Sequence, residues 1–97
     1  MIKVEYNNKK ITISGHAGFA DYGKDIVCAS VSSIIYTTVN GLLNIDSESI
    51  KFTDNKIITI EILKNDNITN TLINNMLDLL KELEEQYPKN IKISKGE

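Results

Sequence analysis

The feature that most constrains the fold is an apolar segment in the first half of the chain. From residue 25 to about residue 45, apolar side chains recur with the 3.6-residue spacing of an α-helix. Asp25 is a good N-cap for this helix, because its carboxylate can accept from the unpaired N–H groups of the first turn. A helix with such a stripe must bury it against another layer of structure. The stripe consists of Val27, Val31, Ile34, Ile35, Thr38 and Leu42.

Shorter segments on both sides of this helix alternate apolar and polar residues and predict β-strands. A second amphipathic segment at 67–86 predicts another helix, which Pro88 ends because proline cannot continue the hydrogen-bond ladder. The order β-β-α-β-β-α-β predicts a single α+β domain over residues 1–97, with two helices packed on a small mixed sheet. Strands are expected at 2–6, 11–15, 48–53 and 57–63 and around Ile91 and Ile93, and the second helical stripe contains Ile68, Leu72, Met76, Leu79, Leu80 and Leu83.

Three connections have the composition of turns or loops. Asn7 and Asn8 tolerate positive φ, so a hairpin turn is expected between the first two strands. A second hairpin turn is expected at 53–56. Residues 15–24 contain three glycines and no periodicity, which predicts a mobile loop.

Charge and composition exclude several classes of function. The net charge is −2 and no block of Lys and Arg forms a basic face, so direct binding of nucleic acid is not expected. No stretch of about 18 apolar residues is apparent, so no membrane span is expected. The acidic Glu5 and the alternation of residues 1–6 do not fit a signal peptide. A lone cysteine without an export signal favours the reducing cytoplasm.

The chain has one cysteine, Cys28, and one histidine, His16. If Asp25 is the N-cap, Cys28 is the third residue of the helix, where unpaired N–H groups and the helix dipole stabilise a thiolate. The thiolate is the nucleophilic form of cysteine. His16 ends the second strand, and the loop returns the chain to the helix, so imidazole and thiol can meet and exchange a proton. The N–H groups at the helix start can also stabilise an oxyanion.

Each of these residues also has a purely structural explanation. A cysteine in an apolar helix is usually a small core residue, and a histidine at a strand end usually serves packing. Asp25 can be a cap alone, and the glycines can serve tight turns. The combination of cysteine, histidine, helix start and glycine-flanked loop within a short stretch favours a catalytic role over a purely structural one.

The stretch from Gly15 to Ser32 closely resembles the signature of the Prp family of ribosomal-processing cysteine proteases. The shared pattern is G-H-A, a short loop, and then G-x-D-I-V-C-A-x-V-S, which includes both His16 and Cys28. Ser30 stands where alanine is frequent in the family. Length and element order extend the resemblance over most of the chain.

The resemblance implies an α+β homodimer that removes a short N-terminal extension from a large-subunit ribosomal protein and cuts after an aromatic residue. It implies Cys28 as nucleophile and His16 as general base and acid, with no cofactor. Asp25 is then either the residue that orients His16 or only the cap, and Asp21 lies near the pair too. The loop is expected to order on the substrate. Candidate substrate contacts are Gly18, Phe19, Tyr22, Gly23 and Ser32, although a serine in a helix more often bonds back to its own backbone.

Two other classes of function remain open at this level. A non-enzymatic binding module in ribosome assembly requires an inert, buried Cys28. A thiol redox sensor requires a reactive Cys28 without peptidase activity, and it lacks a resolving cysteine in this chain. No metal is expected, since one cysteine and one histidine fall short of the three or four protein ligands that zinc usually needs.

Overall fold

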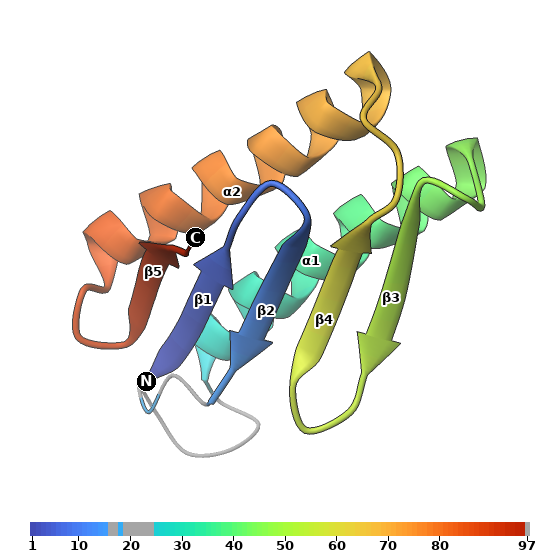
Figure 1. The fold of residues 1–97 in the computed structure, drawn as a ribbon. Helices are drawn as coiled ribbons and strands as arrows, with labels where there is room; N and C mark the ends of the chain where they lie inside the picture. Colours follow the sequence, from blue (N-terminus) through green and yellow to red (C-terminus); the bar gives the residue numbers. More distant parts are fainter. Residues whose placement is uncertain (16–17, 19–24, 97) are drawn as a thin grey trace.

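The computed structural model describes residues 1–15, 18 and 25–96. They form five strands and two helices in the predicted order, and both helices lie on one side of the sheet (Figure 1). The α+β class is therefore confirmed, and the boundaries differ from the predicted ones by one or two residues. The elements are β1 (Ile2–Tyr6), β2 (Lys10–Ser14), α1 (Ile26–Ile45), β3 (Ile50–Asp54), β4 (Ile58–Ile62), α2 (Asn67–Gln86) and β5 (Ile91–Lys95).

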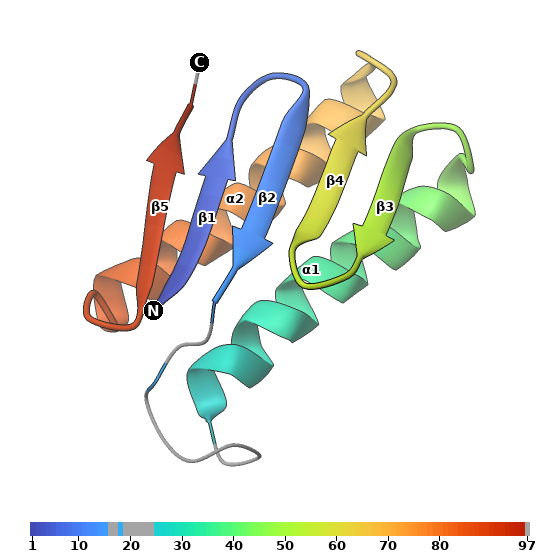
Figure 2. The same ribbon diagram turned by 60° about the horizontal axis from the view of Figure 1, so that its bottom comes forward.

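The sheet is mixed, with the strand order β3-β4-β2-β1-β5. β1 and β5 run parallel, and the other three neighbouring pairs are antiparallel. Figures 1 and 2 show a two-layer molecule in which α1 and α2 cover the same face of the sheet. The strands alternate accordingly, because successive side chains point to opposite faces. Residues such as Val4, Ile11 and Ile60 are fully buried beneath the helices, whereas Lys3, Glu5 and Lys51 face outward.

Both helices bury an apolar stripe, as predicted, but some of the buried residues differ from the predicted ones. In α1 the buried residues are Val27, Val31, Ile35, Val39 and Leu42, so Val39 takes the place predicted for Thr38. In α2, Ile68 and Leu79 are 52% and 39% exposed. The buried stripe of α2 is rotated by about one residue, because the helix must face both the sheet and α1. It contains Thr69, Ile73, Met76, Leu77 and Leu80.

The first hairpin turn forms as predicted, but not by positive φ. None of the described non-glycine residues has a positive φ. Instead the Asn7 side chain accepts from the N–H groups of Lys9 and Lys10 at 2.8 and 2.9 Å. The Asn7 N–H also donates to the Lys10 carbonyl at 3.0 Å. An asparagine that bonds to the backbone two residues on mimics a turn, so the side chain closes the hairpin.

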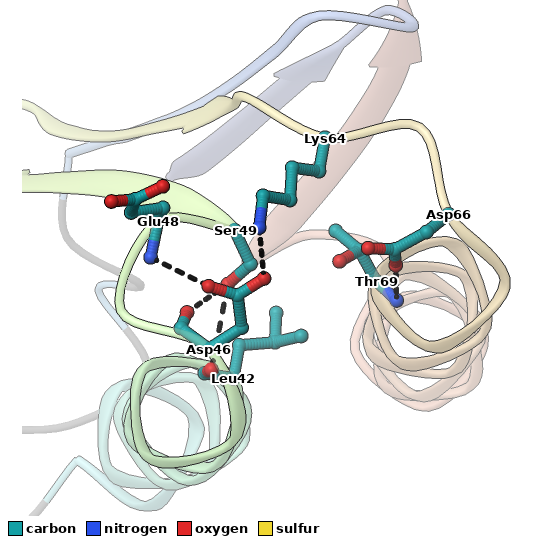
Figure 3. A network of polar contacts seen from close by, with 7 residues as sticks. All are labelled: Leu42, Asp46, Glu48, Ser49, Lys64, Asp66 and Thr69. Carbon is teal, nitrogen blue, oxygen red and sulfur yellow. Dashed lines mark hydrogen bonds and ion pairs between the residues drawn. The ribbon is translucent and has the colours of Figure 1, made fainter.

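A polar network joins the end of α1 to the segment just before β3 and the segment just after β4 (Figure 3). The Asp46 carboxylate accepts from Lys64 Nζ at 2.5 Å and from the Glu48 N–H at 2.9 Å. The buried Ser49 hydroxyl donates to the Asp46 carbonyl at 2.8 Å. The Lys64 contact, as the largest cause, and the Glu48 N–H bond hold the pKa of Asp46 below its ordinary value.

No apolar stretch of about 18 residues is expected from the sequence, and α1 differs from that expectation. Among the described residues, Ile26–Ile45 is long and apolar enough to cross a membrane by length and composition, with a mean hydropathy of 1.6. The core helix of a globular protein passes the same test, and five residues of α1 lie in the core here.

Candidate active site

The site lies where the end of β2, the start of α1 and the β3–β4 turn come together at one end of the sheet (Figure 2). A surface hollow of about 290 Å³ opens between them. Its inner wall is apolar and its rim is polar. It is lined by Ile2, Ile13, Ser14, Gly15, Cys28, Val31, Ser32, Asp54, Asn55, Lys56 and Ile58.

Cys28 is the third residue of α1, as predicted. Asp25 is the N-cap, with φ −81° and ψ 100°, and its Oδ1 accepts from the N–H groups of Val27 and Cys28 at 3.0 Å each. The cap thereby sets where the helix begins. Cys28 is partly buried against the core and contributes to the wall of the hollow.

The same cap corrects one expectation about the helix start. The N–H groups of Val27 and Cys28 donate to Asp25, so neither is open to an oxyanion while the cap is in place. The Ala29 N–H donates to the Asp25 carbonyl at 3.1 Å. An oxyanion at Cys28 therefore needs a different donor or a displaced Asp25 carboxylate.

Gly15 directly follows β2 and has a conformation that requires glycine. Its φ is +85°, and an added Cβ would lie 2.3 Å from the Met1 carbonyl oxygen. Both the backbone angle and the close approach exclude a larger residue. The chain therefore leaves β2 in a defined direction just before His16.

Several predicted site residues lie outside the described part of the chain. They are His16, Phe19, Asp21, Tyr22 and Gly23. Gly18 is described and has a φ of +67°, and a Cβ added there would have no neighbouring atom within 4 Å. The orientation of His16 toward Cys28, and of Asp25 toward His16, stays a prediction.

Ser32 lies one turn after Cys28 and is exposed in the same hollow. The expected bond back to its own helix does not occur among the described residues. Ser30 makes that kind of bond instead, with its hydroxyl 2.7 Å from the Ile26 carbonyl. Ser32 therefore presents its side chain to the hollow.

Sequence reasoning missed the third side of the hollow, which is supplied by Asp54 at the end of β3 and by Asn55 and Lys56 in the β3–β4 turn. It also missed Tyr36, whose hydroxyl donates to Asp54 Oδ2. This hydrogen bond is the main cause that raises the pKa of Tyr36. The spacing of Cys28, Ser32 and Tyr36 was the available signal, because residues four apart share one helix face.

A second and larger hollow, of about 590 Å³, lies between the exposed faces of α1 and α2. Its described lining includes Ile26, Ile34, Leu79 and Leu83, and Cys28 is not part of it. Among the described residues, no group of three or more His, Cys, Asp or Glu side chains can hold a metal ion. Because Cys28 lines the smaller hollow, we take that hollow as the candidate site.

A small α+β fold with a cysteine in the first turn of a helix, beside an open hollow, has the layout of a thiol-dependent enzyme. The chain belongs to the cysteine protease Prp family, whose model matches residues 1–92. This finding confirms the resemblance drawn from residues 15–32 and establishes the class as cysteine protease.

Individual relatives agree with this membership. The ribosomal processing cysteine protease Prp of Staphylococcus aureus is 31% identical over 90 residues, which cover 87% of this chain and 83% of the relative. The protein of the same name in Mycoplasma genitalium is 41% identical over 58 residues, and the match spans 60% of this chain and 56% of that protein.

Solved structures have the same fold. The S. aureus Prp protease in complex with a covalently linked product peptide has a TM-score of 0.91 and 27% identity, and the match covers 99% of this chain and all of that one. The same protease with a substrate peptide has a TM-score of 0.81 at 24% identity, covering 98% of this chain and 97% of that one.

Proposed function

We propose that this protein is a cysteine endopeptidase that removes a short N-terminal extension from a bacterial large-subunit ribosomal protein. The observation that carries the proposal is the position of Cys28 in the first turn of α1, at the wall of an open hollow. The covalently linked peptide in the S. aureus relative supports a mechanism with a covalent intermediate. A cytoplasmic location follows from the substrate class.

The proposed reaction has two steps. His16 takes the proton of the Cys28 thiol, the sulfur bonds to the scissile carbonyl carbon, and the carbon–nitrogen bond breaks as His16 protonates the leaving amine. Water then adds to the thioester with help from His16, the carbon–sulfur bond breaks, and the new carboxyl end leaves. Asp25 acts here as the cap that holds Cys28 at the helix start.

The hollow supports a cut after an aromatic residue. Ile2, Ile13, Val31 and Ile58 give it an apolar inner wall, which suits a large apolar side chain. Its volume of about 290 Å³ leaves room for one such side chain beside the thiol. Phe19, Tyr22 and Gly23 stay predicted substrate contacts and lie outside the described residues.

The experiment that tests the proposal uses a peptide spanning the N-terminal extension of the ribosomal protein. Products are identified by mass spectrometry with the wild type, Cys28→Ala and His16→Ala. We expect one cut after an aromatic residue, and its loss in both variants. Absence of cleavage by the wild type at high enzyme concentration would favour the binding module, and cleavage by Cys28→Ala would overturn the nucleophile.

A further inference from the structure

One stripe of α1 faces the β3–β4 turn. Cys28, Ser32 and Tyr36 follow each other at intervals of four residues, so they lie on one side of the helix. Cys28 and Ser32 line the hollow, and Tyr36 reaches the same turn beyond it, where its hydroxyl donates to Asp54 Oδ2. The Tyr36 ring also packs edge-on against Phe52 of β3, with centroids 5.5 Å apart and an interplanar angle of 79°.

Inside the β3–β4 turn, residues 55–57, backbone bonding is weak, and the strand pairing on either side ends at Asp54 and Ile58. Its own bond, from the Asn55 N–H to the Ile57 carbonyl, is 3.5 Å long. The β1–β2 turn, by contrast, is closed by three bonds of 2.8–3.0 Å centred on Asn7. A bond of 3.5 Å is at the weak end of the hydrogen-bond range. The Tyr36–Asp54 hydrogen bond adds a link between the last residue before this turn and the helix that carries the thiol.

The turn matters because it is one wall of the hollow. Asp54, Asn55 and Lys56 form the side of the hollow that faces α1. A wall that moves outward widens the hollow and loses contact with whatever side chain enters it. A hydroxyl that donates to a carboxylate makes a stronger bond than a neutral pair does, and the exposure of Asp54 to water reduces what this bond contributes.

We propose that Tyr36 is a positioning residue for substrate binding, because its hydrogen bond to Asp54 holds the β3–β4 turn as a wall of the Cys28 hollow. This inference rests on the proposed peptidase function. Tyr36 acts through the turn, not on the reacting atoms. Its loss should weaken binding of the peptide and leave the thiol itself unchanged.

The test compares Tyr36→Phe with the wild type on the peptide substrate. This variant keeps the ring against Phe52 and removes only the hydroxyl. We expect KM to rise about threefold to tenfold, as for loss of one partly exposed charged hydrogen bond, while kcat changes by less than about twofold. The rate of Cys28 alkylation by iodoacetamide should stay the same. Asp54→Asn, which removes the charge of the acceptor, should move KM in the same direction.

The control is Lys64→Gln, which breaks a comparable exposed contact with Asp46 at the other end of α1. It should leave KM unchanged. An unchanged KM in Tyr36→Phe would overturn the proposal, and so would an equal change in KM and in the alkylation rate, which would place the effect on the thiol.

Hydrogen exchange separates this proposal from the proposed function. The amides of residues 55–57 should exchange faster in Tyr36→Phe than in the wild type or in Lys64→Gln. If the wild type cuts no peptide, the peptidase function fails and the substrate role of the wall fails with it, whether or not exchange changes. If the wild type cuts the peptide and the amides of residues 55–57 exchange equally in Tyr36→Phe and the wild type, the proposed role of Tyr36 is wrong and the peptidase function stands.

Discussion

At the scale of single residues, Asp25 is the side chain on which the thiol position depends. Its Oδ1 accepts from two consecutive N–H groups, one of which belongs to Cys28 itself. The sequence leaves two roles open for this carboxylate, as a cap or as the group that orients His16. The hydrogen bonds establish the cap, and a pair of substitutions can separate the two roles.

We expect Asp25→Ala to lower the free energy of unfolding by about 1 kcal/mol, because the first turn of α1 loses its acceptor. Asp25→Asn keeps an acceptor oxygen and should stay within about 0.5 kcal/mol of the wild type, since asparagine caps helices about as well as aspartate. Urea unfolding followed by circular dichroism measures both values. Peptide cleavage by Asp25→Asn should remain within about twofold of the wild type.

A different outcome for Asp25→Asn would show that Asp25 takes part in catalysis. A large fall in kcat for Asp25→Asn with unchanged stability would show that the negative charge matters beyond the cap. Orientation of His16 would then be the role that explains the loss.

At the scale of elements, α2 depends on a cap of the same kind. Asp66 Oδ1 accepts from the Thr69 N–H at 2.8 Å, and Thr69 is buried. The N–H bond is the largest cause that lowers the pKa of Asp66 below its ordinary value of 3.8. A carboxyl whose pKa is lowered by folding stabilises the folded state above its ordinary pKa, and this contribution disappears as the pH falls through the folded pKa.

Stability should therefore fall in acid partly through Asp66. Between about pH 6 and about pH 3, the Tm of the wild type should decrease more than the Tm of Asp66→Asn, whose cap does not titrate. Thermal unfolding at a series of pH values tests this. Equal decreases in the two proteins would show that the Asp66 cap contributes nothing to the acid sensitivity.

At the scale of the whole molecule, the two helices leave an apolar groove uncovered on the face away from the sheet. Ile26 and Leu79 are 52% and 39% exposed, and Ile34 and Leu83 also line the groove. We propose a second copy of the chain as the partner of this groove, in keeping with the predicted homodimer.

Leu79→Glu should then shift the protein from dimer to monomer in light scattering at micromolar concentration, because a carboxylate would be buried in the interface. Leu63→Glu is the matched control, since Leu63 is 55% exposed and does not line the groove. A wild type that is already monomeric would contradict the proposal. Dissociation by Leu63→Glu but not by Leu79→Glu would place the interface elsewhere.

Local sequence determined a large part of this protein. Periodicity predicts all seven elements, and Asp25 predicts the start of α1, because caps and amphipathic stripes depend on residues within one or two turns. The stretch from Gly15 to Ser32 predicts the family, which the family model confirms. Gly15 is the last residue of a predicted strand, although only the structure shows the Met1 carbonyl that requires a glycine there.

Tertiary structure alone decided how these pieces meet. The strand order, the rotated stripe of α2 and the exposure of Leu79 depend on contacts between elements far apart in the sequence, which no local pattern encodes. The same holds for the site. The β3–β4 turn lies more than twenty residues after Cys28, and it lines the same hollow because α1 packs on the sheet beside it.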